Sequence, residues 1–251
     1  MALHAEFGSE PFGFSGDGRF VATVKSTTVQ VWNADTGALV RSLTAKESSS
    51  IFFLNAVARS PDGALVAAGG VFGQSLWLWN LADGRRIELD AAGTAAIGGV
   101  SSLRFSPDGR VLVSGDNGVA WLWRTSDNTL LDPLGDERIL TSGAFSPAGD
   151  MLGLVYSDTV TLWRTSDETT LRTISTGQGV ASVVAFSANG ETLAVLSDGG
   201  SVSLWRTSDG APLGTLASMD TESNVRFVPD GQTLATITGS TVRLWRASDM
   251  G

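Results

Sequence analysis

Six tryptophans recur along the chain at a nearly constant interval, and this period limits the possible folds more than any other feature. The steps between them are 47, 44, 40, 42 and 40 residues, and they stand at Trp32, Trp79, Trp123, Trp163, Trp205 and Trp245. A period of this length indicates one supersecondary unit copied many times, each copy burying its apolar faces against its neighbours. We therefore predict one repeat domain over residues 1–251, with the function on its surface and these tryptophans as structural residues.

Alignment on the tryptophans shows what is repeated. An apolar stretch ending in Phe-Ser leads to a turn that ends in glycine, as at 105–109 and 186–190. A second apolar stretch and a polar turn follow, and then a stretch that ends in Leu-Trp-Arg-Thr-Ser-Asp at 122–127, 162–167 and 204–209. These short stretches are rich in Val, Leu, Thr and aromatic residues, which predicts strands joined by hairpins. Asp-Gly and Asn-Gly favour two-residue turns there, and no stretch has a helical period.

A fourth strand is expected in each repeat, for example at 39–43 and 171–174. Four short strands per repeat at this period are typical of a β-propeller blade. On these motifs the chain resembles the WD40-repeat family, and most of all the divergent repeats found in large bacterial proteins. The resemblance covers nearly the whole chain in six copies. It implies an all-β fold, a β-propeller of six four-stranded blades.

The repeats depart from the family pattern in their polar residues. The family's Gly-His dipeptide is absent, and the one histidine is His4. In the family, that histidine joins a hydrogen-bonded network with a turn Asp, a strand Ser or Thr, and the Trp. Here Asp116, Asp158 and Asp198 hold turn positions, so only part of that network is kept. We therefore predict that the repeat tryptophans act as hydrophobic packing elements rather than as members of a polar network.

The last repeat stops at Gly251, where the others continue into a fourth strand. The spacing from Gly18 places Leu3 where a fourth strand should end, so the N-terminus is a candidate for completing the last blade. Two alternatives stay open: a six-bladed ring closed by a short strand, or a piece of a longer propeller with an incomplete last blade. An unpaired outer edge exposes backbone groups, which favours self-association through the open last blade.

The repeats differ most in the loops of the first three copies. Relative to the other copies, residues are added at 46–53, 70–74 and 91–99. By family topology, the loops from fourth to first strand and from second to third strand lie on one rim. The additions therefore fall on one face of blades one to three, and insertions of this kind often mark the binding face of a repeat protein. The apolar residues that they carry are the candidate partner-binding residues Phe52, Phe53, Phe72 and Ile97.

Two extra tryptophans, Trp77 and Trp121, each precede a repeat tryptophan by two residues. They occupy equivalent positions in adjacent repeats, so we expect them to lie near each other. They complete the set of candidate partner-binding residues. The alternative is that both are packed in the interior, with Trp77 filling space left by Arg59, which stands where other repeats have Phe.

Composition argues against several function classes. The net charge is −9 and the basic residues are scattered, which disfavours nucleic-acid and anionic-membrane partners. There is no cysteine, and the one histidine, His4, does not stand near the repeated Ser and Thr hydroxyls that it would have to activate. We therefore predict no enzyme, no cofactor and no metal site. The first residues lack a signal-peptide pattern and no segment has the length of a transmembrane helix, so the expected location is the cytoplasm.

The predicted function is a non-catalytic protein–protein interaction scaffold that binds a protein or peptide partner through the loop face of blades one to three. The alternative is a regulatory, sensor or structural module of a larger multidomain signalling protein, which contacts its own neighbouring domains.

Overall fold

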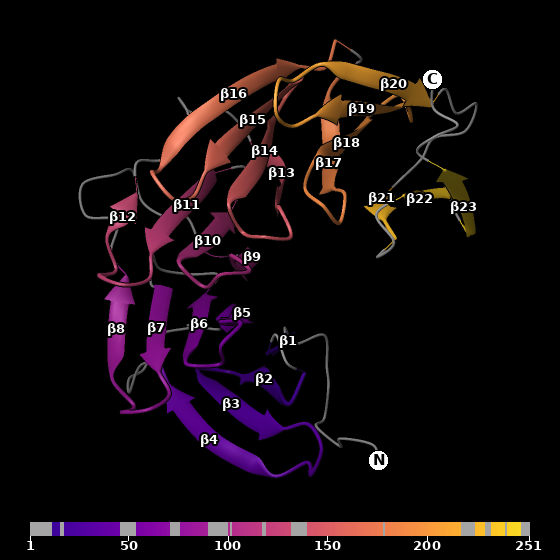
Figure 1. The fold of residues 1–251 in the computed structure, drawn as a ribbon. Helices are drawn as coiled ribbons and strands as arrows, with labels where there is room; N and C mark the ends of the chain where they lie inside the picture. The colour runs from indigo at the N-terminus through magenta and orange to yellow at the C-terminus, as the bar shows by residue number, and fades with distance from the viewer. Residues whose placement is uncertain are drawn as a thin grey trace. The chain divides into compact units, whose positions relative to one another are not determined.

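The computed structural model is built from antiparallel β-sheets (Figure 1). It describes residues 12–15, 18–45, 54–70, 76–89, 100, 102–116, 119–131, 140–177, 179–216, 224–228, 232–238 and 240–246. These residues form six sheets, of which five have four strands and one has three. The all-β fold class and the four-stranded repeat are therefore confirmed. The number of blades in the complete protein stays a prediction.

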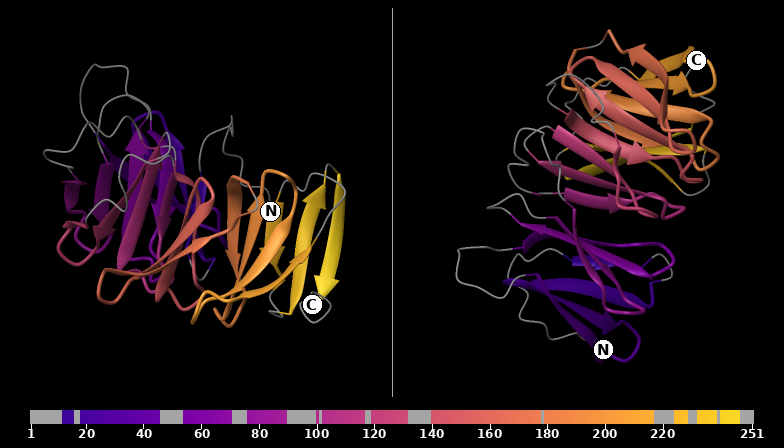
Figure 2. Two further views of the ribbon diagram at one scale, coloured as in Figure 1. Left: turned by 90° about the horizontal axis from the view of Figure 1, so that it is seen from above. Right: turned by 90° about the vertical axis from the view of Figure 1, so that its left-hand side faces the viewer.

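The chain divides into two compact units, Met1–Gly135 and Asp136–Gly251. The expected single domain over 1–251 is not tested by this division, and each unit is described by itself. Three sheets make up each unit, and the views in Figure 2 show the sheets of a unit standing side by side.

The described part of the first unit forms twelve strands in chain order. Its first sheet is β1 (Phe12–Phe14), β2 (Phe20–Lys25), β3 (Thr28–Asn33) and β4 (Leu39–Thr44). The second is β5 (Leu54–Arg59), β6 (Leu65–Gly70), β7 (Leu76–Asn80) and β8 (Arg86–Leu89). The third is β9 (Ser102–Phe105), β10 (Val111–Asp116), β11 (Val119–Arg124) and β12 (Leu130–Leu131).

The second unit repeats the same order. Its first sheet, the fourth of the chain, is β13 (Leu140–Phe145), β14 (Met151–Tyr156), β15 (Thr159–Arg164) and β16 (Thr169–Ser175). The fifth is β17 (Ala181–Phe186), β18 (Thr192–Ser197), β19 (Val202–Arg206) and β20 (Pro212–Leu216). The sixth is β21 (Asn224–Phe227), β22 (Thr233–Thr238) and β23 (Thr241–Arg246).

Apolar clusters fill the space between consecutive sheets. One joins the first and second sheets, one the second and third, one the fourth and fifth, and one the fifth and sixth. Each repeat tryptophan in these clusters packs towards the preceding sheet: Trp79, Trp123, Trp205 and Trp245. A sheet of this kind buries its faces only when neighbours stand on both sides, which explains why the sequence repeats its apolar pattern so regularly.

The tryptophans also make polar contacts, which corrects the expectation of purely hydrophobic packing. The indole Nε1 of Trp32 donates to Thr23 Oγ1 at 2.9 Å, and that of Trp123 donates to Ser114 Oγ at 2.9 Å. Two further repeat tryptophans behave likewise, Trp205 with Ser203 at 2.9 Å and Trp245 with Thr236 at 3.0 Å. An indole–hydroxyl contact is therefore present in at least four copies. In three of them the acceptor lies on the second strand, nine residues before the tryptophan, whereas the acceptor of Trp205 lies on its own strand.

The expectation of two-residue turns at Asp-Gly was wrong. Five residues, 106–110, connect β9 to β10, and Gly109 N donates to Ser106 O at 2.8 Å. Gly109 takes φ 73°, in the left-handed region where glycine is not strained. Two-residue turns occur instead between second and third strands, at 26–27 and 157–158.

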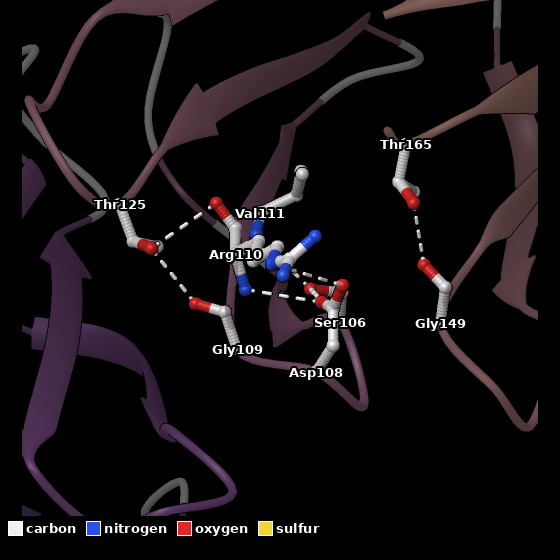
Figure 3. A network of polar contacts seen from close by, with 8 residues as sticks. All are labelled: Ser106, Asp108, Gly109, Arg110, Val111, Thr125, Gly149 and Thr165. Carbon is white, nitrogen blue, oxygen red and sulfur yellow. Dashed lines mark hydrogen bonds and ion pairs between the residues drawn. The ribbon is translucent and has the colours of Figure 1, made fainter. Parts of the chain in front are cut away.

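The phrase Arg-Thr-Ser-Asp stabilises this turn (Figure 3). Thr125 Oγ1 donates to Gly109 O at 2.8 Å, and Thr165 Oγ1 repeats the contact with Gly149 O at 2.7 Å. Arg124 pairs with Asp127 at 2.9 Å, three residues further on. Because each of these contacts satisfies a turn or a strand end, the phrase has a structural role.

Candidate interaction surface

The first inserted loop, 46–53, starts and ends at fixed points. At its start, Ala45 N donates to Thr27 O at 2.9 Å, and at its end Leu54 N donates to Ser26 O at 3.0 Å. Both anchors, Ala45 and Leu54, are buried in the cluster between the first and second sheets. The loop therefore leaves the first sheet and enters the second sheet beside the two-residue turn that connects β2 to β3.

The other two inserted loops also begin and end at buried residues. Gly70 and Leu76 flank the stretch 71–75, and Leu89 and Val100 flank the stretch 90–99. Val100 N donates to Gly70 O at 2.9 Å, so the end of the third loop lies beside the start of the second. The described ends of all three loops thus lie at one end of the sheets in the first unit.

A shorter loop in the second unit shows the same arrangement without an insertion. Thr176 N donates to Asp158 O at 2.8 Å, and Ala181 N donates to Ser157 O. Four residues, 177–180, lie between these anchors, whereas eight residues, 46–53, lie between Ala45 and Leu54. The first loop is therefore four residues longer between two attachment points that are equivalent in the two repeats.

Four of the six candidate partner-binding residues, Phe52, Phe53, Phe72 and Ile97, lie outside the described residues. The loops that carry them have described ends, and their role in binding stays a prediction.

The two remaining candidates, Trp77 and Trp121, are buried, with 6% and 7% of their surface exposed. Trp77 lies in the cluster between the first and second sheets, and Trp121 in the cluster between the second and third. The expectation that they lie near each other is therefore not met, because each faces the sheet that precedes its own. Their burial agrees with the packing alternative and places them beneath the loop ends.

Arg86, which no sequence motif marks as a site residue, connects Trp77 to the start of the first loop. Its guanidinium carbon lies 4.8 Å from the centre of the Trp77 ring, a cation–π arrangement. Its Nη1 donates to Thr44 O at 3.0 Å and to Ala45 O at 2.6 Å. These carbonyls immediately precede the first loop. No local sequence signal shows this contact, because its partners lie 41 and 42 residues earlier in the chain.

Arg59 of the second sheet contacts both the first sheet and the turn that follows its own strand. Its guanidinium carbon lies 4.3 Å from the centre of the Phe20 ring, and its Nη2 donates to Gly63 O at 2.7 Å. Strand register aligns Arg59 with Val66 and Trp79, whereas Trp77 is aligned with Ala68. Trp77 therefore does not replace the missing aromatic of this repeat, since the Arg59 side chain occupies that space against the first sheet.

The pKa values of Asp62 and Tyr156 are shifted by their surroundings in the structure. A hydrogen bond from Ser60, and then one from the Ala64 amide, hold the pKa of Asp62 below its usual range. Burial raises the pKa of Tyr156 to about 12. Among the described residues, no group of three or more His, Cys, Asp or Glu could hold a metal ion, and no helix is long and apolar enough to cross a membrane.

The fold and these contacts define a repeat protein of antiparallel sheets whose inserted loops spring from one end of three neighbouring sheets. A family model of the WD domain, G-beta repeat, matches residues 94–124, which contain β9, β10 and β11. Residues 94–124 are therefore similar to a WD40 repeat, in agreement with the resemblance seen in the sequence.

Two curated rice proteins (Oryza sativa subsp. japonica) are similar to part of the chain. The small ribosomal subunit protein RACK1z is 36% identical over 85 residues, which is 34% of this chain and 24% of that protein. The small ribosomal subunit protein RACK1y is 32% identical over 111 residues, which is 44% of this chain and 30% of that protein. The similarity thus spans less than a third of the length of these relatives.

Proposed function

We propose that this chain is a non-catalytic interaction scaffold that binds a protein or peptide partner through its inserted loops. The observation that carries the proposal is the common origin of three inserted loops at one end of the first unit. Their six flanking residues are buried: Ala45, Leu54, Gly70, Leu76, Leu89 and Val100. Loops held on a rigid frame are the usual place for recognition, because the frame can stay constant while the loops vary.

The candidate contact residues supply suitable chemistry. Phe52, Phe53, Phe72 and Ile97 are large and apolar, and all four belong to the added stretches. Aromatic anchors in the centre of an interface commonly supply most of its binding energy. The WD40 repeats and the similarity to two RACK1 proteins support a partner that is a protein or a peptide.

The test uses the whole chain as bait for a displayed library of random peptides. Selected peptides are then titrated against a loop variant, Phe52→Ser with Phe53→Ser and Phe72→Ser. We expect at least about tenfold weaker binding, since losing one anchor commonly costs more than about 1 kcal/mol.

The matched control changes apolar surface elsewhere on the same unit. Leu39 and Val40 are exposed at the start of β4, away from the inserted loops, and their double change to Ser should leave peptide affinity unchanged. Circular dichroism and thermal unfolding establish that both variants are folded. Equal binding by the loop variant and the wild type would refute the assignment of this face.

The alternative function, a regulatory, sensor or structural module that contacts neighbouring domains of a larger protein, makes a different prediction. In that case the library yields no peptide whose binding depends on the loop phenylalanines.

A further inference from the structure

The turn between β17 and β18 of the fifth sheet contains the pair Asn189-Gly190. In such a pair the glycine amide nitrogen can attack the asparagine side chain, because glycine has no side chain to hinder the approach. Asn189 is exposed, whereas Gly190 is buried. The pair therefore combines an asparagine amide that water can reach with a nitrogen nucleophile that the fold covers.

The reaction open to this pair is deamidation through a cyclic imide. The Gly190 amide gives its proton to a solvent base, its nitrogen forms a bond to Asn189 Cγ, and the side-chain nitrogen leaves as ammonia. Water then opens the ring at one of its two carbonyls. Opening at the former side-chain carbonyl leaves aspartate at position 189, and opening at the backbone carbonyl leaves isoaspartate. The side-chain NH2 is replaced by OH, and no oxidant or reductant is needed.

The native turn holds both reacting groups in hydrogen bonds. Gly190 N donates to Ser187 O at 2.9 Å, and Gly190 O accepts from Thr207 Oγ1 at 2.9 Å. Asn189 Oδ1 accepts from Ser187 Oγ at 2.7 Å and from Glu191 N at 3.1 Å, and Asn189 Nδ2 donates to Glu191 Oε2 at 2.9 Å. Loss of the Gly190 proton breaks the first of these bonds, and departure of the side-chain nitrogen breaks the last.

Two aspartates in other sheets show which product fits this turn. Asp62 and Asp108 occupy the same place in the second and third sheets. Ser60 Oγ donates to Asp62 Oδ1 at 2.6 Å, and Ala64 N donates to the same oxygen at 3.0 Å, which are the contacts that Asn189 Oδ1 makes. Aspartate at position 189 can therefore keep the turn. Isoaspartate adds a side-chain carbon to the main chain, so the hydrogen bonds of the turn lose their spacing.

We propose that Asn189 is a deamidation site that the native turn holds unreactive, so that the reaction takes place only when this turn opens. The buried, hydrogen-bonded amide of Gly190 carries the proposal, since a protected amide reacts through local opening, as it does in hydrogen exchange. Isoaspartate formed in the open turn keeps the turn from closing, so the opening is recorded covalently. This modification is independent of the inserted loops and of their proposed partner.

The test incubates the full chain at mildly alkaline pH, with and without denaturing urea, and follows residue 189 by peptide mass mapping. In urea both Asn-Gly pairs of the sequence, at 117–118 and 189–190, should react, so that the first pair is an internal reference. In native buffer, residue 189 should react at least about tenfold more slowly than in urea, because only open molecules react.

One variant loosens the turn without changing the pair. Ser187→Ala removes the hydroxyl that donates to Asn189 Oδ1 and accepts from Thr192 N at 3.0 Å. It should raise the rate at residue 189 several-fold in native buffer and leave the rate in urea unchanged. Ser146→Ala is the matched control, because Ser146 has the same place in the fourth sheet and donates to Asp150 Oδ1 at 2.6 Å. It should react at residue 189 at the wild-type rate.

Circular dichroism establishes that both variants are folded. If Ser187→Ala does not fold, the wild type in graded urea below its unfolding midpoint replaces it, and the rate at residue 189 should rise with urea. Equal rates at residue 189 in native buffer and in urea overturn the proposal. A rate in the opened turn, by Ser187→Ala or by graded urea, that equals the native wild-type rate also overturns it, as does equal acceleration by Ser146→Ala.

Discussion

Removing the Ser114 hydroxyl tests whether the Trp–hydroxyl contacts stabilise the sheets. The Trp123 indole donates to Ser114 Oγ at 2.9 Å, and the two side chains are 1% and 0% exposed. Ser114→Ala leaves a buried N–H without this acceptor, and such a group costs about 1–3 kcal/mol. With a urea dependence of about 2 kcal/mol per molar, the unfolding midpoint should fall by about 1 M.

A matched contact nearer the solvent supplies the comparison. Thr23 accepts from Trp32, whose side chain is only half-buried, so water can replace the lost acceptor. Thr23→Val keeps the shape of the side chain, and its cost should stay below about 1 kcal/mol. Urea unfolding followed by circular dichroism gives both values, and hydrogen exchange in β10 and β11 shows whether the loss at Ser114 is local.

The outcome that refutes this reasoning is an equal or reversed order of the two costs. If Ser114→Ala unfolds at the wild-type midpoint, or if Thr23→Val costs more, the indole contacts contribute nothing that depends on burial. The tryptophans would then be packing elements alone, as the sequence predicted.

Three further perturbations test other parts of the molecule. Tyr156 is the one tyrosine in the sequence, and its pKa is raised to about 12. The stability that it contributes is therefore complete below its unfolded pKa and is lost as pH rises through its folded pKa. Ultraviolet titration should show ionisation near pH 12 in the native protein and near pH 10 in denaturant. A Cβ on Gly69 would lie 2.3 Å from Val100 Cβ, so Gly69→Ala should lower the free energy of unfolding by about 1–3 kcal/mol, whereas Gly199→Ala, with nothing within 4 Å, should change it by less than about 0.5 kcal/mol. The lowered pKa of Asp62 contributes stability that is present above its unfolded pKa and is lost as pH falls through its folded pKa. Asp62→Asn should therefore unfold at a lower urea concentration than the wild type at neutral pH and at the same concentration in acid. A difference between the two midpoints that persists in acid would contradict this pH dependence.

The strands were predictable because local sequence determines them. Short runs rich in β-branched and aromatic residues between turn residues favour strands, and the tryptophan period aligned them into four-stranded units. The turns were less predictable. Asp-Gly pairs are compatible with several turn types, and the five-residue connection at 106–110 depends on Thr125, which lies 16 residues after Gly109.

The polar contacts of the tryptophans could have been found only with the strand register in hand. Thr23, Ser114 and Thr236 each lie nine residues before a repeat tryptophan, a spacing that has meaning only when the turn between second and third strands is known. Repeats with other residues there, such as Leu154 before Trp163, hid the pattern. The contacts of Arg86 were not predictable, because its partners lie 41 and 42 residues earlier, at the end of the preceding sheet.

The hydrogen bonds at the two ends of the first inserted loop allow its length to vary. The neighbouring carbonyls of Ser26 and Thr27 hold both ends of the loop, and the equivalent carbonyls of Ser157 and Asp158 hold a loop of half the length. Because the ends stay together whatever lies between them, doubling a loop costs only about 0.6 kcal/mol in closure entropy. The turn between second and third strands thus fixes both ends of the inserted loop, so that loops of different length and composition can stand between the same two hydrogen bonds. Sequences grafted between Ala45 and Leu54 should therefore be tolerated by the sheets below.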